Sequence, residues 1–221
     1  MQSIKPKKSL VDETYEILVE AICLREFEPG ERLNQDEIAA RLNISRQPVN
    51  SAIAILKADN LVEDTGRRGV IVAPIDPDMS SSIYEYRMVI EPMAVELAAR
   101  HLPQTARSEA DAILKEGREA VERADMRALL QSDRCFHEMI YGWSRNLVIQ
   151  KSMQVTWNHL RRDMAEVLRD PSRSAPIWDE HAEIVDALLS GDTTGAADLM
   201  RDHLRNAHER NSRPGDGSST G

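Results

Sequence analysis

Hydrophobic residues in the first 75 positions follow helical spacing first and strand-like runs afterwards. The apolar positions predict amphipathic helices over Leu10–Phe27 and Gln35–Leu42, and a third helix with Ser45 at its N-cap. Two short β-rich runs follow, Leu61–Glu63 and Val70–Ala73, and the turn-forming residues between them indicate a hairpin. Three helices and a hairpin predict a winged helix-turn-helix domain.

The third helix has one apolar side and one polar side. Its apolar residues recur at i, i+3, i+4 and i+7, and they are Val49, Ala52, Ile53 and Leu56. This spacing leaves Arg46, Gln47 and Asn50 exposed, which is the layout of a recognition helix. Asn43 precedes the helix where a tight turn favours a residue that tolerates positive φ, and Ser45 suits the N-cap.

From Asp78 onwards the pattern is helical throughout. Helices are expected over Asp78–His101, Ser108–Arg123, Met126–Tyr141, Leu147–Leu168, Pro176–Ser190 and Thr194–Asn211. Pro92 should kink or divide the first of these, and Pro74–Pro77 marks a domain boundary. The expected fold class is mainly α, with a winged helix-turn-helix over 1–75, an all-helical bundle of about six helices over 76–211 and a disordered tail over 212–221.

Composition excludes a membrane protein and favours the cytoplasm. The chain is 41% apolar and 29% charged, and it has no apolar run of about 18 residues, so no membrane span is expected. Cys23 and Cys135 lie in different helical segments without a CxxC spacing, so we expect reduced, buried thiols and a cytoplasmic location.

The net charge of −9 is unevenly distributed. Residues 1–75 carry 10 Lys and Arg against 12 Asp and Glu, a net of −2, whereas the remainder carries 18 against 25, a net of −7. Within 41–75, five basic residues stand against three acidic ones. Because contact with phosphates requires a local positive face rather than a positive chain, the charge is compatible with DNA binding.

The exposed polar residues of the winged domain suit DNA. Arg46 can bridge O6 and N7 of guanine, and Gln47 or Asn50 can bridge N6 and N7 of adenine. Arg67 and Arg68, at the hairpin tip, can reach phosphates or the minor groove. The alternative is that all five are ordinary solvated side chains, but a helix-turn-helix beside a hairpin with a basic tip favours DNA.

The same segment resembles the GntR family of regulators. The residues that carry the resemblance are Gly30 to Val49, above all Ile44-Ser45-Arg46-Gln47-Pro48-Val49, then Leu61-Val62 and the wing Gly66-Arg67-Arg68-Gly69. The resemblance implies that a homodimer binds double-stranded operator DNA, with Arg46 and Gln47 among the contacts.

Two positions depart from the family pattern. Relatives commonly carry Arg where this chain has Asn50, and some carry Arg where it has Asp36. We therefore expect Asn50 to be a changed specificity position. Since Asp36 cannot hold a phosphate, the affinity should depend more on Arg67, Arg68 and the Lys7-Lys8 arm.

Four residues of the helical segment have the chemistry of a metal site. Asp133 and His137 are four apart, so they project from one face of a helix, and His181 and His203 lie on two later helices. One carboxylate and three imidazoles can hold a divalent metal and leave positions open for a ligand. The alternative is core or surface histidines. Cys135 lies about 200° around the helix from Asp133 and is not expected to be a ligand.

From about residue 78 to residue 209 the chain resembles the FCD ligand-binding domain of the FadR subfamily. The residues that carry the resemblance are Arg87, Glu91, Asp133, Phe136, His137, His181 and His203. Six expected helices fit the shorter, VanR-like form. The resemblance implies that Asp133, His137, His181 and His203 coordinate a divalent ion such as zinc or nickel, and that a small carboxylate completes the coordination.

Arg87 is the first candidate for pairing with the carboxylate of such an effector, because a guanidinium matches that group bidentately. The alternative is an ion pair between Arg87 and Glu91, one turn on. Trp157, Asn158 and Arg162 could also line the cavity.

Together these features predict a transcription regulator, a repressor that a small organic acid releases from its operator. One alternative is a metal-dependent hydrolase fused to a DNA-binding module, which needs a general base beside the metal. Glu138 and Glu180 adjoin ligands, but no motif places either as a base, so no enzyme is expected. Another alternative is a regulator that senses no ligand and holds a purely structural metal.

Overall fold

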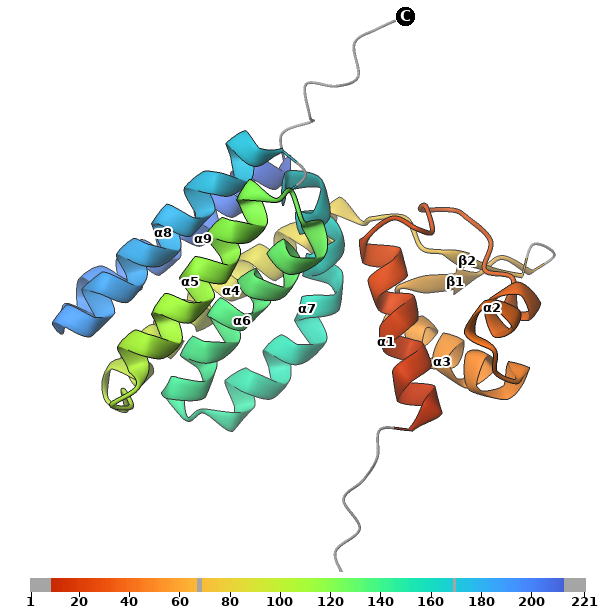
Figure 1. The fold of residues 1–221 in the computed structure, drawn as a ribbon, viewed down its shortest axis with the longest axis horizontal. Coiled ribbons are helices and arrows are strands. Elements are labelled where there is room, and N and C mark those ends of the chain that lie inside the picture. The colour runs from red at the N-terminus through yellow and green to blue at the C-terminus, as the bar shows by residue number, and fades with distance from the viewer. Residues whose placement is uncertain (1–8, 67–68, 169, 213–221) are drawn as a thin grey trace, which may run out of the picture. The chain divides into compact units, whose positions relative to one another are not determined.

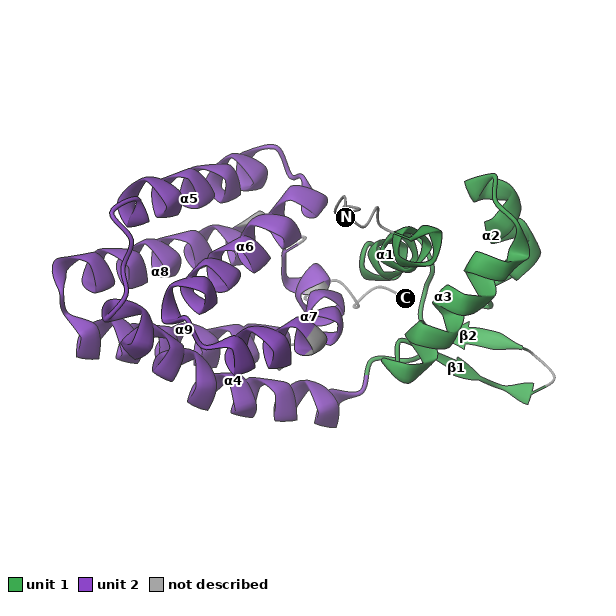
Figure 2. Cartoon of the chain, turned by 90° about the horizontal axis from the view of Figure 1, so that it is seen from below, with its two compact units in different colours: residues 1–75 green, residues 76–221 purple. Residues whose placement is uncertain are grey.

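The computed structural model describes residues 9–66, 69–168 and 170–212 (Figure 1). The chain divides into two compact units, residues 1–75 and 76–221 (Figure 2). The first unit holds helices and a two-stranded sheet, and the described part of the second holds helices alone. This confirms the expected fold class.

Helix α1 (Leu10–Cys23) begins at a capping box and ends earlier than expected. The Asp12 N–H donates to Ser9 Oγ at 3.1 Å, and the Ser9 N–H donates to Asp12 Oδ2 at 3.2 Å. The prediction that this helix continues to Phe27 is wrong. The chain leaves the helix after Cys23, and Arg25 takes a φ of 57°, a left-handed conformation that a helix cannot include.

Helices α2 (Gln35–Leu42) and α3 (Arg46–Ala58) form the helix-turn-helix. Asn43 takes a φ of 53° and a ψ of 44°, as the sequence indicated. Ser45 is the N-cap of α3 by its backbone, although its side chain makes no capping hydrogen bond within the described residues. The four expected apolar residues of α3 are buried, which fixes the polar side outward.

Strands β1 (Val62–Asp64) and β2 (Val70–Val72) pair antiparallel, with Val62 opposite Val72 and Asp64 opposite Val70. Each is short, and β1 starts one residue later than expected. Arg67 and Arg68, the predicted tip of the wing, lie outside the described residues, as does the Lys7-Lys8 arm.

The second unit is built from helices α4 (Pro77–Ala99), α5 (Ala106–Glu122), α6 (Met126–Ser144), α7 (Leu147–Leu168), α8 (Pro171–Ser190) and α9 (Thr193–Ser212). Pro92 does not divide α4, which runs through it. Helix α8 begins five residues before the expected Pro176, because Pro171 is tolerated in a first turn and Asp170 caps it by accepting from the Ser172 N–H at 2.9 Å. Of the predicted tail, Ser212 ends α9, and 213–221 lie outside the described residues.

Helix packing in this unit brings distant parts of the sequence together. Helix α4 packs along α9 and α6, α8 packs on α9 and α5, and α6 packs on α7 (Figure 1). Side chains on the inner faces of α4, α6, α8 and α9 therefore meet in one interior. Among the residues that the structure describes, no helix has both the length and the apolarity to cross a bilayer.

Candidate metal centre and nucleic-acid interface

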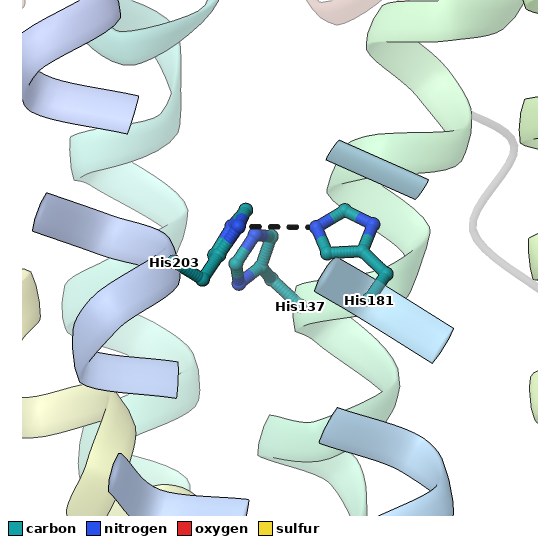
Figure 3. Close-up of side chains that lie close together, drawn as sticks. All are labelled: His137, His181 and His203. Atoms are coloured by element: carbon teal, nitrogen blue, oxygen red, sulfur yellow. Dashed lines mark hydrogen bonds between the residues drawn. The ribbon is translucent and has the colours of Figure 1, made fainter. Parts of the chain in front are cut away.

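Three histidines converge inside the helical unit. His137 comes from α6, His181 from α8 and His203 from α9, and all three side chains are buried (Figure 3). One ring nitrogen from each lies within 4.8 Å of the other two. Nε2 of His181 lies 3.3 Å from Nε2 of His203. Three imidazole nitrogens this close together could hold one metal ion.

Asp133 lies one turn before His137 and adds a carboxylate at the edge of the cluster. Its Oδ1 lies 3.7 Å from Nε2 of His181. Its side chain is 1% exposed, and neither oxygen has a hydrogen-bond partner within the described part of the chain. Burial raises the pKa of Asp133 to about 7. A buried carboxylate without a partner is costly, and a cation among the three histidines would offset that cost. The residues present thus fit a divalent metal.

Glu91 orients the ring of His137. Glu91 Oε2 lies 2.6 Å from Nδ1 of His137, and Glu91 also pairs with Arg87. Burial alone would raise the pKa of Glu91, but the charge of Arg87 and the hydrogen bonds from His137 and Arg87 outweigh it and lower that pKa. Because an ionised carboxylate only accepts, Nδ1 of His137 donates to it and Nε2 keeps its lone pair. Burial also lowers the pKa of His137 to about 4, so the ring is neutral, as a ligand must be.

Glu180 plays the same part for His203. Its Oε2 lies 2.7 Å from Nδ1 of His203, and it also pairs with Arg210. Burial would raise the pKa of Glu180, but hydrogen bonds from His203 and Arg210 lower it to about 2. Nε2 of His203 is thereby directed at the cluster. Carboxylates behind ligating histidines are typical of metal sites.

Aromatic rings position the third histidine. The His181 ring stacks on Phe136 with the centroids 3.7 Å apart and the planes 13° apart. The Trp178 ring meets it edge to face at 5.0 Å. Burial lowers the pKa of His181 well below its usual value, so this ring is also neutral.

The residues predicted to bind an effector differ in their burial and their contacts. Arg87 is buried against Glu91, the ion pair that the sequence left as the alternative, and its Nη2 lies 3.3 Å from Nε2 of His137. Its guanidinium carbon lies 5.3 Å from the centre of the Trp157 ring. Arg162 is buried and Asn158 is half-buried, both on α7. Their contact with an effector stays a prediction.

Sequence reasoning missed the contacts that span helices. Glu91 was expected only as a partner of Arg87, and Glu180 only as a neighbour of His181. No local pattern marks either contact, because Glu91 and His137 are 46 positions apart and Glu180 and His203 are 23 apart. Cys135 was expected to be buried and is half-buried; its Sγ accepts from the Gln131 side chain at 3.3 Å.

The predicted recognition surface lies on α3. Arg46, Gln47 and Asn50 are all exposed, on the side opposite the buried residues of that helix. Arg46 is not unpartnered, since its Nε lies 3.0 Å from Oδ1 of Asp36 on α2. Contact of these residues with DNA stays a prediction.

Each of the two units matches a known protein family. Residues 10–72 match the family model described as bacterial regulatory proteins, gntR family, and residues 82–206 match the FCD domain. A regulator from an unstable DNA locus of Streptomyces ambofaciens is 26% identical over 189 residues, which is 85% of this chain and 79% of that protein. The transcriptional repressor RspR of Escherichia coli K12 is 24% identical over 93% of this chain and 90% of its own length.

Solved structures share the fold. A GntR regulator from Rhodococcus sp. RHA1 superposes with a TM-score of 0.78 at 27% identity, covering 91% of this chain and 96% of its own. McbR/YncC of E. coli superposes with a TM-score of 0.79 at 21% identity, covering 90% and 95%. Together with the two family matches, this shows that the chain belongs to the GntR family of bacterial transcription regulators, with an N-terminal helix-turn-helix and a C-terminal FCD effector-binding domain.

Proposed function

We propose that this regulator is a metal-dependent repressor that a small carboxylate releases from its operator. The observation that carries the proposal is the buried cluster of three histidines beside the unpartnered carboxylate of Asp133. His137, His181, His203 and Asp133 would hold a divalent cation, with zinc or nickel the best match to three imidazoles and one carboxylate. Bound there, the ion would offer its remaining positions to oxygen ligands.

The surroundings of the cluster favour an anionic effector. Arg87 supplies buried positive charge next to His137. The indole Nε1 of Trp157 is a buried donor that has no hydrogen-bond partner in the described parts of the chain, and its ring lies 5.4 Å from that of His137. A carboxylate would satisfy the indole donor, since it only accepts, and the charge of Arg87 would favour it.

Effector binding would act through helix packing. The four ligands come from α6, α8 and α9, so binding at the cluster joins helices that are distant in the sequence. An effector changes operator affinity only if it binds two arrangements of these helices with different affinity. Release from the operator then follows from the spacing of two DNA-binding units in a homodimer.

An exposed apolar surface supports the dimer. Tyr86, Val89 and Met93 follow one another along α4, and Leu147 and Val148 begin α7. Val89 and Val148 are 70% and 75% exposed in a single chain. Apolar side chains with this exposure on neighbouring helices favour contact with a second copy. In the dimer, Arg46, Gln47 and Asn50 of each copy would read one half-site.

The two alternatives make different predictions. For a hydrolase, the carboxylates beside the ligands are poorly placed as bases: Glu138 pairs with Arg134 at 2.7 Å, and Glu180 pairs with His203 and Arg210. For a regulator with a structural metal, no organic acid would alter operator binding. We propose that the protein catalyses no reaction and responds to its effector.

Metal analysis of the purified protein tests the site. We expect about one divalent ion per chain, and little in His181→Ala and His203→Ala, with lowered thermal stability in both. The matched control is His101→Ala, two residues beyond the last residue of α4 and outside the cluster, which should keep its metal. Metal content near zero in the parent protein after growth in supplemented medium would refute the metal site.

A thermal-shift screen of small organic acids on metal-loaded protein tests the effector. An acid present at about 100 times its Kd stabilises the folded state by about 2.7 kcal/mol. Each stabilising acid is then added to a gel-shift assay with operator DNA, where we expect release. A stabilising acid that leaves DNA binding unchanged would refute the regulatory role.

A further inference from the structure

The carboxylate of Asp36 contacts the first residue of the recognition helix. Oδ1 of Asp36 lies 3.0 Å from Nε of Arg46, and the two side chains are 67% and 59% exposed. Asp36 is the second residue of α2, and Arg46 is the first of α3. An acidic side chain is thus paired with the Arg that the proposed function assigns to base reading.

The backbone brings the two residues near each other. The side chain of Asn34 accepts from the Asp36 N–H at 3.1 Å and donates to Glu37 at 2.6 Å, which fixes the first turn of α2. The left-handed residue Asn43 fixes the turn from α2 to α3. The start of α2 therefore faces the start of α3, and Asp36 can reach Arg46.

A guanidinium can contact a base or a phosphate, and the nearby carboxylate affects these two contacts differently. The carboxylate lies nearest Nε, so a guanine could still approach Nη1 and Nη2 with its O6 and N7 acceptors. As a phosphate contact, however, Arg46 is weakened, because the carboxylate offsets its charge and repels the phosphates. An exposed ion pair of this kind changes an equilibrium by only about 1.4- to 5-fold, which a bidentate base contact exceeds.

We propose that Asp36 is a specificity-determining residue. Its charge lies beside Nε of Arg46 and favours base reading by the guanidinium, and it suppresses the use of Arg46 as a general phosphate contact. This inference rests on the proposed role of α3 as the recognition helix. Its signature is a gain of non-specific binding, rather than a loss of all binding, when the carboxylate is neutralised.

The test uses the full chain and two DNA duplexes. The first duplex is the one that the parent protein enriches most from a random 20-bp pool, and the second is a scramble of it. Dissociation constants are measured at several salt concentrations for the parent, Asp36→Asn and the matched control Glu37→Gln. Glu37 is the neighbouring exposed carboxylate, and it contacts Asn34 rather than Arg46. Asp36→Ser serves as a second variant, and thermal melts confirm folding.

We expect Asp36→Asn to tighten binding to the scrambled duplex about two- to five-fold and to steepen its salt dependence by about one phosphate equivalent. Binding to the selected duplex should change less, so the ratio of the two constants falls. Glu37→Gln should leave that ratio intact. Equal tightening on both duplexes, or no change on either, overturns the proposal. In an Arg46→Ala background, Asp36→Asn should no longer alter the ratio, and a persistent effect there also overturns it.

Failure of the proposed function gives a different result. If Arg46→Ala binds the selected duplex as tightly as the parent, or if no sequence is enriched, then α3 is not the reading helix. If Arg46→Ala weakens binding but Asp36→Asn leaves the ratio unchanged, only the role of Asp36 is refuted.

Discussion

Replacing Asp133 by Asn should stabilise the metal-free protein while it abolishes metal binding. The Asp133 carboxylate is buried, and its oxygens have no hydrogen-bond partner among the described residues. Burial raises its pKa from 3.8 to about 7. Because each tenfold change in an acid constant corresponds to about 1.4 kcal/mol, the ionised form costs the folded state about 4 kcal/mol at pH 8. Asn removes the charge but leaves a buried polar group that costs about 1–3 kcal/mol. The net gain in unfolding free energy is therefore about 1–3 kcal/mol.

The pH dependence follows from the direction of the shift. The pKa of Asp133 in the folded state lies above its unfolded value, so its contribution to stability is fully present below pH 3.8 and is lost as pH rises through 7. The advantage of Asp133→Asn over the parent should therefore grow from pH 4 to pH 7 and stay constant above. With zinc added, the order reverses, because the parent gains the free energy of metal binding.

Urea unfolding, followed by circular dichroism after treatment with EDTA, measures these differences at pH 5 and pH 8. Zinc is then added back to both proteins at pH 8. The reasoning is refuted if metal-free Asp133→Asn is less stable than the parent at pH 8. It is also refuted if the difference between the two proteins is the same at both pH values, or if zinc stabilises both proteins equally.

Two further predictions concern packing and DNA binding. A Cβ at Gly117 would lie 2.2 Å from ring carbons of Trp178, so Gly117→Ala should lower the unfolding free energy by about 1–3 kcal/mol, measured by urea unfolding. Gly142→Ala, where nothing lies within 4 Å, is the control and should be neutral or slightly stabilising; equal effects would contradict the packing. Replacing Arg67 and Arg68 together by Ala should weaken binding to all duplexes and reduce the salt slope by up to about two phosphate equivalents per wing, and an unchanged slope would show that the wing does not contact DNA.

Local patterns predicted the winged domain well because its elements are determined by neighbours in the sequence. The spacing of Val49, Ala52, Ile53 and Leu56 sets the buried face of α3, and Asn43 supplies its left-handed turn. The errors occurred at helix ends. There, for example, a proline can either interrupt a helix or stand in its first turn. The helix expected from Pro176 instead opens at Pro171, since a first turn does not need the N–H that proline lacks.

The local sequence pattern predicted only part of the candidate metal site. Asp133 and His137 lie one helical turn apart, and that spacing alone brings them to one face of α6. His181 and His203 reach them only through the packing of α8 and α9, so the resemblance to a known domain was needed to choose them. The roles of Glu91 and Glu180 depend on how helices are rotated against one another. A sequence without aligned relatives does not contain that information.

Aromatic side chains beside the histidine cluster make the intrinsic fluorescence of the protein sensitive to the ion bound there. Two of the three tryptophans in the chain belong to it: Trp157 lies 5.4 Å from the ring of His137, and Trp178 lies 5.0 Å from that of His181. The third, Trp143, donates its indole N–H to Glu109 at 3.0 Å. An open-shell ion such as nickel, held by these histidines, would quench most of the intrinsic fluorescence, whereas closed-shell zinc would not. The emission of the unlabelled protein therefore distinguishes between the two metals.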